Sequence, residues 1–243
     1  EFTKVYESTC YEGDKTAAMW GAKVTTVGET GENVAGNLTT AQIKAQLDGK
    51  LAGEGIEASQ ILYVDLSGLN SVVETEDVTF ENLRDGLAPN TLVYLPKGVN
   101  AGTYNYSSQL QDGSAFYACD NIRIADKYPF FAPYGITVTA EQFVEYTRKI
   151  TIDKNGKVRI ATVMLPFTVS VEGSGLHTNE DGTSLSVWTM QENNFISTIS
   201  PDGNPTNYNS DVHFVEYSSF TGKTEADAPY MVKVENAPGD AGS

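Results

Sequence analysis

The chain is short of positive charge. Its 243 residues include 16 lysines and arginines against 32 aspartates and glutamates, which gives a formal net charge of -16. A chain with this balance repels a phosphate backbone or an anionic lipid surface at long range. We therefore expect no nucleic-acid partner. No run approaches the ~18 consecutive apolar residues of a transmembrane helix, so no membrane span is expected in this chain.

Cysteine is also scarce, with Cys10 and Cys119 as the two examples. The even count permits one disulfide, and in the chain-entropy model a loop of this length contributes ~4 to 5 kcal/mol to stability. Two unrelated buried thiols are the alternative on the residues alone.

Motifs of catalysis and metal binding are absent as well. The sequence contains no H-E-x-x-H, C-x-x-C, Walker loop or dinucleotide fingerprint. "EGSG" around Ser174 lacks the glycine that a nucleophile elbow places two residues before its serine. "DKNGK" at 153–157 lacks the third oxygen ligand of a calcium loop, so a hairpin turn is the better interpretation. We predict no catalytic residue, no metal ligand and no cofactor, and hence a protein that is not an enzyme.

One long stretch has no basic residue at all. Between Arg159 and Lys223 it carries seven acidic side chains: Glu172, Glu180, Asp181, Glu192, Asp202, Asp211 and Glu216. We interpret it as a solvated acidic face. The alternative is a cation site, with calcium as the candidate ion although no motif specifies it.

The first part of the chain has one well-signalled helix. In "LTTAQIKAQLDGKL" Thr39 is the expected cap, Gln42 completes a capping box, and Gly49 is the expected end. "ILYVDLSGL" at 61–69 then alternates at strand period. These patterns predict a small α/β segment over 1–90, with one or two short helices.

From residue 91 onward, strand-like runs recur between turn signals. Examples are "TLVYLP", "SAFYACD", "KVRIATVMLPFTVSV" and "APYMVKVE". Such spacing without a long helical period predicts an antiparallel β sandwich-like domain over 91–243. The fold class is therefore expected to be mainly β.

Aromatic side chains are the most promising binding residues. The chain has 13 tyrosines, 10 phenylalanines and 2 tryptophans. Rings near loops or strand ends can stack on a glycan or a protein partner, whereas rings in general also fill β cores. The candidates are Trp20, Tyr104, Tyr106, Tyr128, Tyr134 and Trp188.

"YPFFAPYG" at 128–135 is the densest aromatic segment. Pro129 and Pro133 fix their own φ angles and favour extended conformations at the residues before them. We interpret the segment as a structural corner that buries at least one phenylalanine ring. The alternative is an exposed platform for sugar rings. In either case Tyr128 and Tyr134 are the rings expected at the surface.

Several phrases in a fixed order carry a family resemblance. They are "APNTLVYLPKGV", "YPFFAPYGITVTAEQFVEYTRK", "ATVMLPFTVS" and "ADAPYMVKV". Over roughly residues 60–235 the chain resembles the carboxy-terminal β-rich region of secreted, cell-surface proteins of Bacteroidota, a region associated with leucine-rich-repeat and adhesin-like segments. "ILYVDLSGLNSV" is similar to the turn that opens a leucine-rich unit, but one copy does not predict a solenoid.

The resemblance implies export and a β fold, and it supplies no catalytic residue. Export in turn favours the Cys10–Cys119 disulfide. Because "EFTKVYESTC" lacks the features of a signal peptide, the chain is expected to be either cytoplasmic or a mature form or piece of an exported protein, and the resemblance favours the extracellular or cell-surface location.

The expected function is a non-enzymatic surface module for adhesion or for binding a host or bacterial surface protein or glycan. The alternatives are an accessory module or catalytic domain of a carbohydrate-active enzyme, and a structural subunit of a surface fibre.

Overall fold

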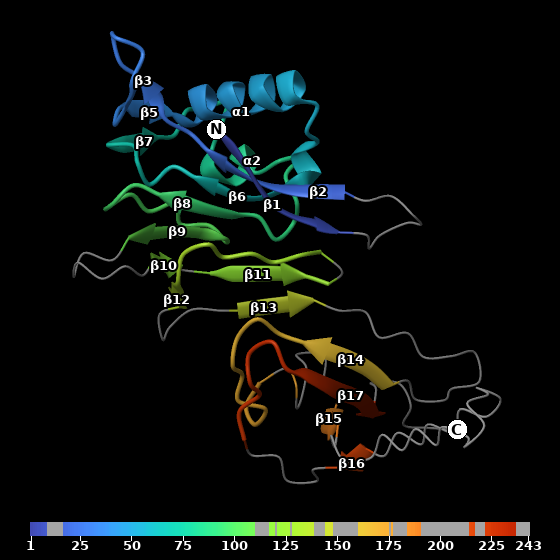
Figure 1. Ribbon diagram of the computed structural model, residues 1–243. Helices are drawn as coiled ribbons and strands as arrows, with labels where there is room; N and C mark the ends of the chain where they lie inside the picture. Colours follow the sequence, from blue (N-terminus) through green and yellow to red (C-terminus); the bar gives the residue numbers. More distant parts are fainter. Residues whose placement is uncertain are drawn as a thin grey trace, which may run out of the picture. The chain divides into compact units, whose positions relative to one another are not determined.

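The computed structural model contains many strands and little helix (Figure 1). It describes residues 1–8, 17–109, 117–119, 121–126, 128–138, 144–147, 160–174, 176, 184–190, 214–216 and 222–236. The helices are α1 (Thr40–Glu54), the 3-10 helix η1 (Ala58–Gln60) and α2 (Phe80–Leu83). The strands are β1 (Phe2–Ser8), β2 (Ala17–Lys23), β3 (Thr26–Val27), β4 (Asn33–Val34), β5 (Asn37–Thr39), β6 (Ile61–Asp65), β7 (Ser71–Val73), β8 (Leu92–Leu95), β9 (Tyr106–Gln109), β10 (Tyr117–Cys119), β11 (Ile122–Ala125), β12 (Ile136–Val138), β13 (Val144–Thr147), β14 (Ile160–Met164), β15 (Ser184–Met190), β16 (Phe214–Glu216) and β17 (Pro229–Asn236).

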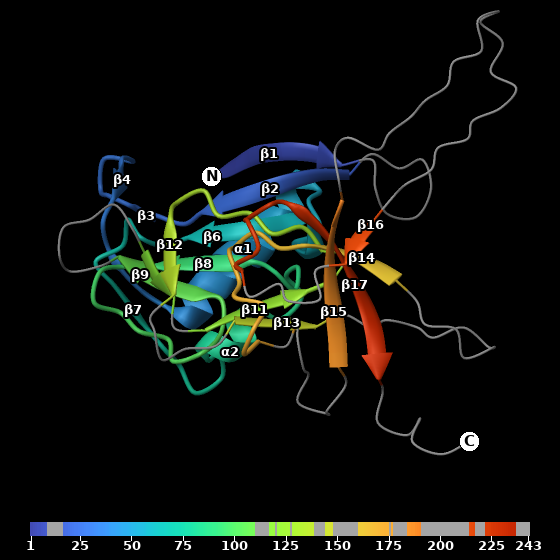
Figure 2. The same ribbon diagram turned by 90° about the horizontal axis from the view of Figure 1, so that it is seen from below.

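The chain divides into two compact units, Glu1–Arg148 and Lys149–Ser243. This division differs from the boundary expected near residue 90, because β8 pairs with β6 and extends the sheet that begins before that residue. In the second unit β14, β17, β15 and β16 form an antiparallel sheet in that order, and Figure 2 shows β15 and β17 side by side.

The first unit is built on a seven-stranded mixed sheet with the order β1-β2-β6-β8-β9-β10-β12. Strands β2, β6, β8 and β9 run parallel and follow one another down the unit in Figure 1. β12 also pairs in parallel with β10, and β11 pairs in parallel with β13. The mainly β class is therefore correct, but the strands from β8 to β12 belong to a mixed sheet in which β9 and β10 pair antiparallel, and not to an antiparallel sandwich. Alternating sequence patterns are the same for both strand directions, so they could not reveal this.

Helix α1 begins as the sequence predicts and ends later. The Thr39 side chain accepts a hydrogen bond from the Gln42 N–H, and the Gln42 side chain accepts one from the Thr39 N–H. The helix continues through Gly49 to a left-handed Gly55, whose φ is 67°. Continuation places Leu51 one turn after Leu47 in the buried face, and this packing outweighs the low helix propensity of glycine.

The two faces of the large sheet bury different side chains. One face packs aliphatic residues against α1 and α2, among them Val64, Val93 and Leu95. The other face carries a smaller cluster of Leu92, Tyr94 and Tyr117. None of the helices in the described part of the chain is long and apolar enough to cross a membrane.

The side chains of two buried asparagines join segments that lie far apart in the sequence. Asn105 is fully buried and has a φ of 61°. Its Nδ2 donates to the Arg123 carbonyl at 2.9 Å and its Oδ1 accepts from the Arg123 N–H at 2.8 Å, so the amide acts as an extra peptide group between two chain segments. Asn90 acts in the same way on Ala125, with Nδ2 to O at 3.1 Å and N to Oδ1 at 2.7 Å.

We expect Asn105→Gly to lower the free energy of unfolding by roughly 2–4 kcal/mol. Glycine keeps the left-handed conformation, so the loss reports the missing side-chain hydrogen bonds and the unsatisfied Arg123 backbone groups. Urea unfolding followed by circular dichroism measures the change. Asn100→Gly, at an exposed loop position, is the control and should lose much less. Equal losses in the two variants would contradict the role given to Asn105.

Candidate functional site

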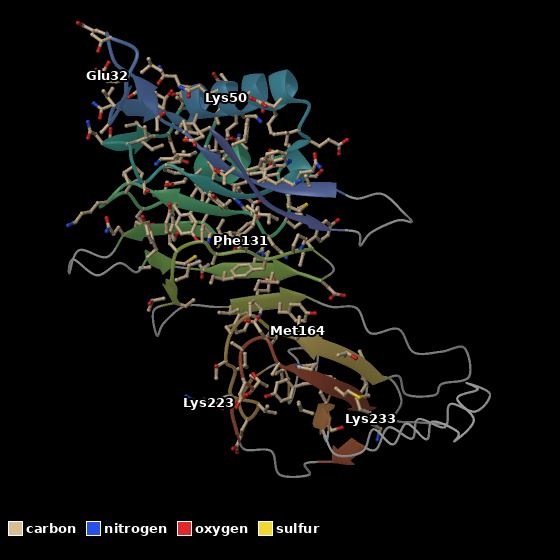
Figure 3. All side chains as sticks on the ribbon, viewed as in Figure 1. Glu32, Lys50, Phe131, Met164, Lys223 and Lys233 are labelled. Carbon is tan, nitrogen blue, oxygen red and sulfur yellow. The ribbon has the colours of Figure 1, made fainter. Side chains whose placement is uncertain are left out.

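The segment 128–135 covers the aromatic face of the sheet. Phe130 packs against the cluster of Leu92, Tyr94 and Tyr117. The ring of Phe131, labelled in Figure 3, lies 6.0 Å from that of Tyr63. The segment therefore contributes rings to the core beneath it, in line with the structural-corner interpretation.

Tyr63 needs a glycine on the neighbouring strand. A Cβ atom on Gly21 of β2 would lie 2.0 Å from the Cζ atom of the Tyr63 ring. Gly21 therefore lets the ring rest directly on the backbone of β2, where any other residue would displace it.

Tyr134 is exposed yet held at several points. Its hydroxyl donates to Asp65 Oδ2 at 3.1 Å, and its ring stacks on Tyr117 with 5.4 Å between centroids. The other carboxylate oxygen of Asp65 accepts from the N–H of Ser67 at 2.9 Å and from its hydroxyl at 2.6 Å. Tyr134 is 38% exposed and Tyr128 is 52% exposed, so the expectation that these two rings reach the surface is confirmed.

Burial and the neighbouring Asp65 carboxylate raise the pKa of Tyr134 to about 12. An unfolded tyrosine loses its proton near pH 10, so the stabilisation that Tyr134 gives is complete below that pH. It is lost as pH rises toward the folded-state value, because the unfolded chain gives up the proton first.

We predict that Tyr134→Phe lowers the free energy of unfolding at pH 7 by about 1–2 kcal/mol, because Asp65 loses a hydrogen bond. Between pH 10 and 12 the stability of the variant should fall less steeply than that of the parent. Chemical unfolding at a series of pH values measures both effects. Tyr128→Phe is the comparison, and a parallel pH profile in parent and Tyr134→Phe would contradict the assignment.

A second feature is a surface pocket of about 360 Å³ in the first unit, here called the Tyr104 pocket. It is lined by Gly102, Thr103, Tyr104, Asn121, Ile122, Arg123 and Glu145. Its lining combines one aromatic ring and one aliphatic side chain with groups that donate and accept hydrogen bonds. Such a mixture in a concave site is typical of small-ligand binding.

The backbone places these residues by long-range pairing. β11 pairs in parallel with β13 so that Arg123 lies opposite Glu145, and Arg123 Nε is 3.0 Å from Glu145 Oε2. Asn105 fixes the position of Arg123 through its backbone and directly follows Tyr104 in the chain. The pocket wall is thus attached to the buried hydrogen bonds of Asn105.

Two guanidinium groups lie over the Tyr104 ring. The Cζ atom of Arg123 is 4.2 Å from the ring centroid, and the Cζ atom of Arg84 is 4.8 Å from it. Arg84 is 8% exposed, and its Nη2 donates to the carbonyls of Pro89 at 3.0 Å and Thr91 at 2.8 Å. Burial lowers the pKa of the Arg84 guanidinium.

The predicted aromatic residues have different fates. Tyr104 lines the pocket, while Tyr128 and Tyr134 lie at the surface over the aromatic face. Tyr106 was proposed as a binding ring but is buried, with its ring 5.6 Å from Phe80 and its hydroxyl donating to the Phe80 carbonyl. It is a core residue because it begins β9 facing the helical side. Trp20 is half-buried against the same core.

Other predictions fall partly or wholly outside the described residues. Trp188 lies on β15, but its side chain is outside them, as is Cys10. Most of the acidic stretch between Arg159 and Lys223 is also outside. Among the residues that the structure does describe, no three histidine, cysteine or acidic side chains gather as a metal site.

Sequence reasoning did not find Arg84, Asn121, Arg123 and Glu145. Each is an ordinary polar residue in its local sequence, and the pocket arises only when β11 and β13 pair. The one hint in the sequence was that arginine is scarce, with four in the chain, so that each arginine was a candidate for a special role.

Comparison of the chain with protein-family models, curated protein sequences and solved structures finds no match. The family resemblance of the sequence phrases therefore stays a hypothesis.

Cys119 is buried at the end of β10, with its Sγ atom 3.3 Å from the Asn121 carbonyl oxygen. The disulfide with Cys10 stays a prediction. We expect no reactive thiol when the chain is purified without reductant, unfolded in guanidinium and titrated with a thiol reagent. Two thiols per unfolded chain would contradict the disulfide, and the same titration after reduction supplies the reference.

Proposed function

We propose that this chain is a non-enzymatic module of an exported surface protein and that it binds a glycan in the Tyr104 pocket. The observation that carries the proposal is the pocket itself, a concave site that joins an aromatic ring to side chains able to donate and to accept hydrogen bonds. The resemblance of the sequence phrases to Bacteroidota surface proteins supports the exported location.

The size and lining of the pocket favour a sugar over a large protein surface. A volume of about 360 Å³ lies at the small end of the range for ligand pockets, roughly 300–1,000 Å³. Sugar hydroxyls both donate and accept hydrogen bonds. Arg123 supplies donors, Glu145 supplies acceptors, and Asn121 and Thr103 supply both.

One feature of the pocket favours binding over catalysis, and another places its main donor in advance. Among the described residues lining the pocket, Glu145 is the one carboxylate, whereas glycoside hydrolysis uses a pair. The Asn105 amide fixes the backbone of Arg123, and the Arg123 guanidinium lies 4.2 Å from the Tyr104 ring centroid, so the main donor of the pocket is placed before a ligand binds.

A protein partner at Tyr128 and Tyr134 is the second candidate. Both rings are exposed, the Tyr134 side chain is held by Tyr117 and Asp65, and the Tyr128 carbonyl accepts a hydrogen bond from Asn90 Nδ2 at 2.8 Å. Rigid exposed tyrosines are favoured at protein interfaces because they lose little conformational freedom on contact.

A glycan array followed by isothermal titration tests the first candidate. We expect binding of a restricted set of glycans and a loss of at least about tenfold in affinity for Arg123→Ala, because that substitution removes the main donor of the pocket. Lys44→Ala is the matched control, since it removes the cation of another surface ion pair, Lys44 with Asp48 on α1, and should bind as the parent does.

Tyr128→Ala separates the two candidates. Binding that survives in Tyr128→Ala and is lost in Arg123→Ala supports the pocket. The opposite pattern would move the site to the tyrosines, and the absence of glycan binding by the folded parent would overturn the glycan proposal. Thermal melts of all variants verify that each is folded.

A further inference from the structure

Two positive charges lie close to the Tyr104 ring. The chain has four arginines in 243 residues, and two of them, Arg84 and Arg123, converge on the ring of Tyr104. In a protein with a net charge of -16 this pairing of guanidinium groups is unusual, because most of the surface repels anions.

Among the residues that the structure describes, Arg84 has no carboxylate as a partner. Its Nη2 atom donates to the neutral carbonyls of Pro89 and Thr91, and its Nε atom has no hydrogen-bond partner among the described residues. The described part of the chain also places no carboxylate within ion-pair distance of this guanidinium. A buried cation without an anion is costly, so an anion bound nearby would offset part of that cost.

Arg123 forms an ion pair with Glu145, and a ligand anion can take the place of Glu145 in that pair. The side chains of Arg123 and Glu145 are 50% and 53% exposed. Ion pairs in such contact with water contribute little to stability, so an incoming anion can replace Glu145 at little cost. A guanidinium binds a carboxylate with two parallel hydrogen bonds and is well suited to this exchange.

The charges of Arg84, Arg123 and Glu145 sum to +1 at a site that also offers the polar side chains of Asn121 and Thr103. We propose, resting on the glycan-binding function above, that the ligand of the Tyr104 pocket is a carboxylated sugar whose carboxylate pairs with Arg123. Arg84, whose Cζ atom is 4.8 Å from the centroid of the Tyr104 ring and which does not line the pocket, supplies positive potential without touching the ligand. Asn121 and Thr103 bind the ring hydroxyls.

The first test compares glycans before and after esterification. An array carrying uronate-containing, sialylated, sulfated and neutral glycans is probed with the parent protein, and then the carboxylated glycans are probed again as methyl esters. We expect the bound set to be carboxylated and to lose binding on esterification. A bound set that is neutral or sulfated, or that survives esterification, overturns this inference and leaves the glycan-binding function standing.

Glu145→Gln gives a test of opposite sign. Removing the competing negative charge should raise the affinity for a carboxylated glycan roughly threefold to tenfold. The glutamine side chain still offers a hydrogen-bond acceptor, so the change in affinity reports the charge. If Glu145 instead serves a neutral sugar, the same substitution lowers affinity or leaves it unchanged. The residue is exposed, so the variant is expected to fold.

Arg84→Met tests the charge of Arg84 beside the Tyr104 ring. It keeps the length of the side chain and should lower affinity for the carboxylated glycan several-fold while it leaves Arg123 in the pocket. Unchanged affinity in a folded Arg84→Met would remove Arg84 from the proposal. If no glycan of any class binds the parent, both this inference and the proposed function fail.

Discussion

The side-chain amide of Asn105 is the interaction on which the first unit depends. It is buried without contact with water, and it supplies both a donor and an acceptor to the backbone of Arg123. Its own backbone N–H donates to the Asn121 carbonyl and its carbonyl accepts from Val93. One residue thus connects β8, the start of β9 and β11. A left-handed φ makes this possible, and asparagine tolerates that conformation while still offering a polar side chain.

The large sheet of the first unit has two faces with different side chains. The face toward α1 and α2 is aliphatic, and it gives the sheet a conventional core. The opposite face is aromatic and is closed by the segment 128–135, which Tyr134 fastens to Asp65. The Tyr104 pocket belongs to neither face. It forms where β11 pairs with β13, so its walls combine residues that lie far apart in the sequence.

The sequence predicted local features better than long-range ones. The capping box of α1 was predictable because Thr39 and Gln42 are three residues apart and act on each other. The direction of β8 and β9 was not, since parallel and antiparallel strands share one alternating pattern. Tyr104 and Tyr106 were indistinguishable in sequence, and only the start of β9 decides that one lines a pocket while the other enters the core. The pairing of Arg123 with Glu145 depends on strand register, for which no local pattern exists.

Asn90 links the strand of the Tyr104 pocket to the segment that carries the exposed tyrosines. Its amide bonds to Ala125, the last residue of β11, and also to the carbonyl of Tyr128, the first residue of the aromatic cover. The strand that carries Arg123 and the segment that carries Tyr134 therefore share one buried anchor. Loss of the Asn90 amide would therefore remove hydrogen bonds from the end of the pocket strand and from the start of the aromatic cover at the same time.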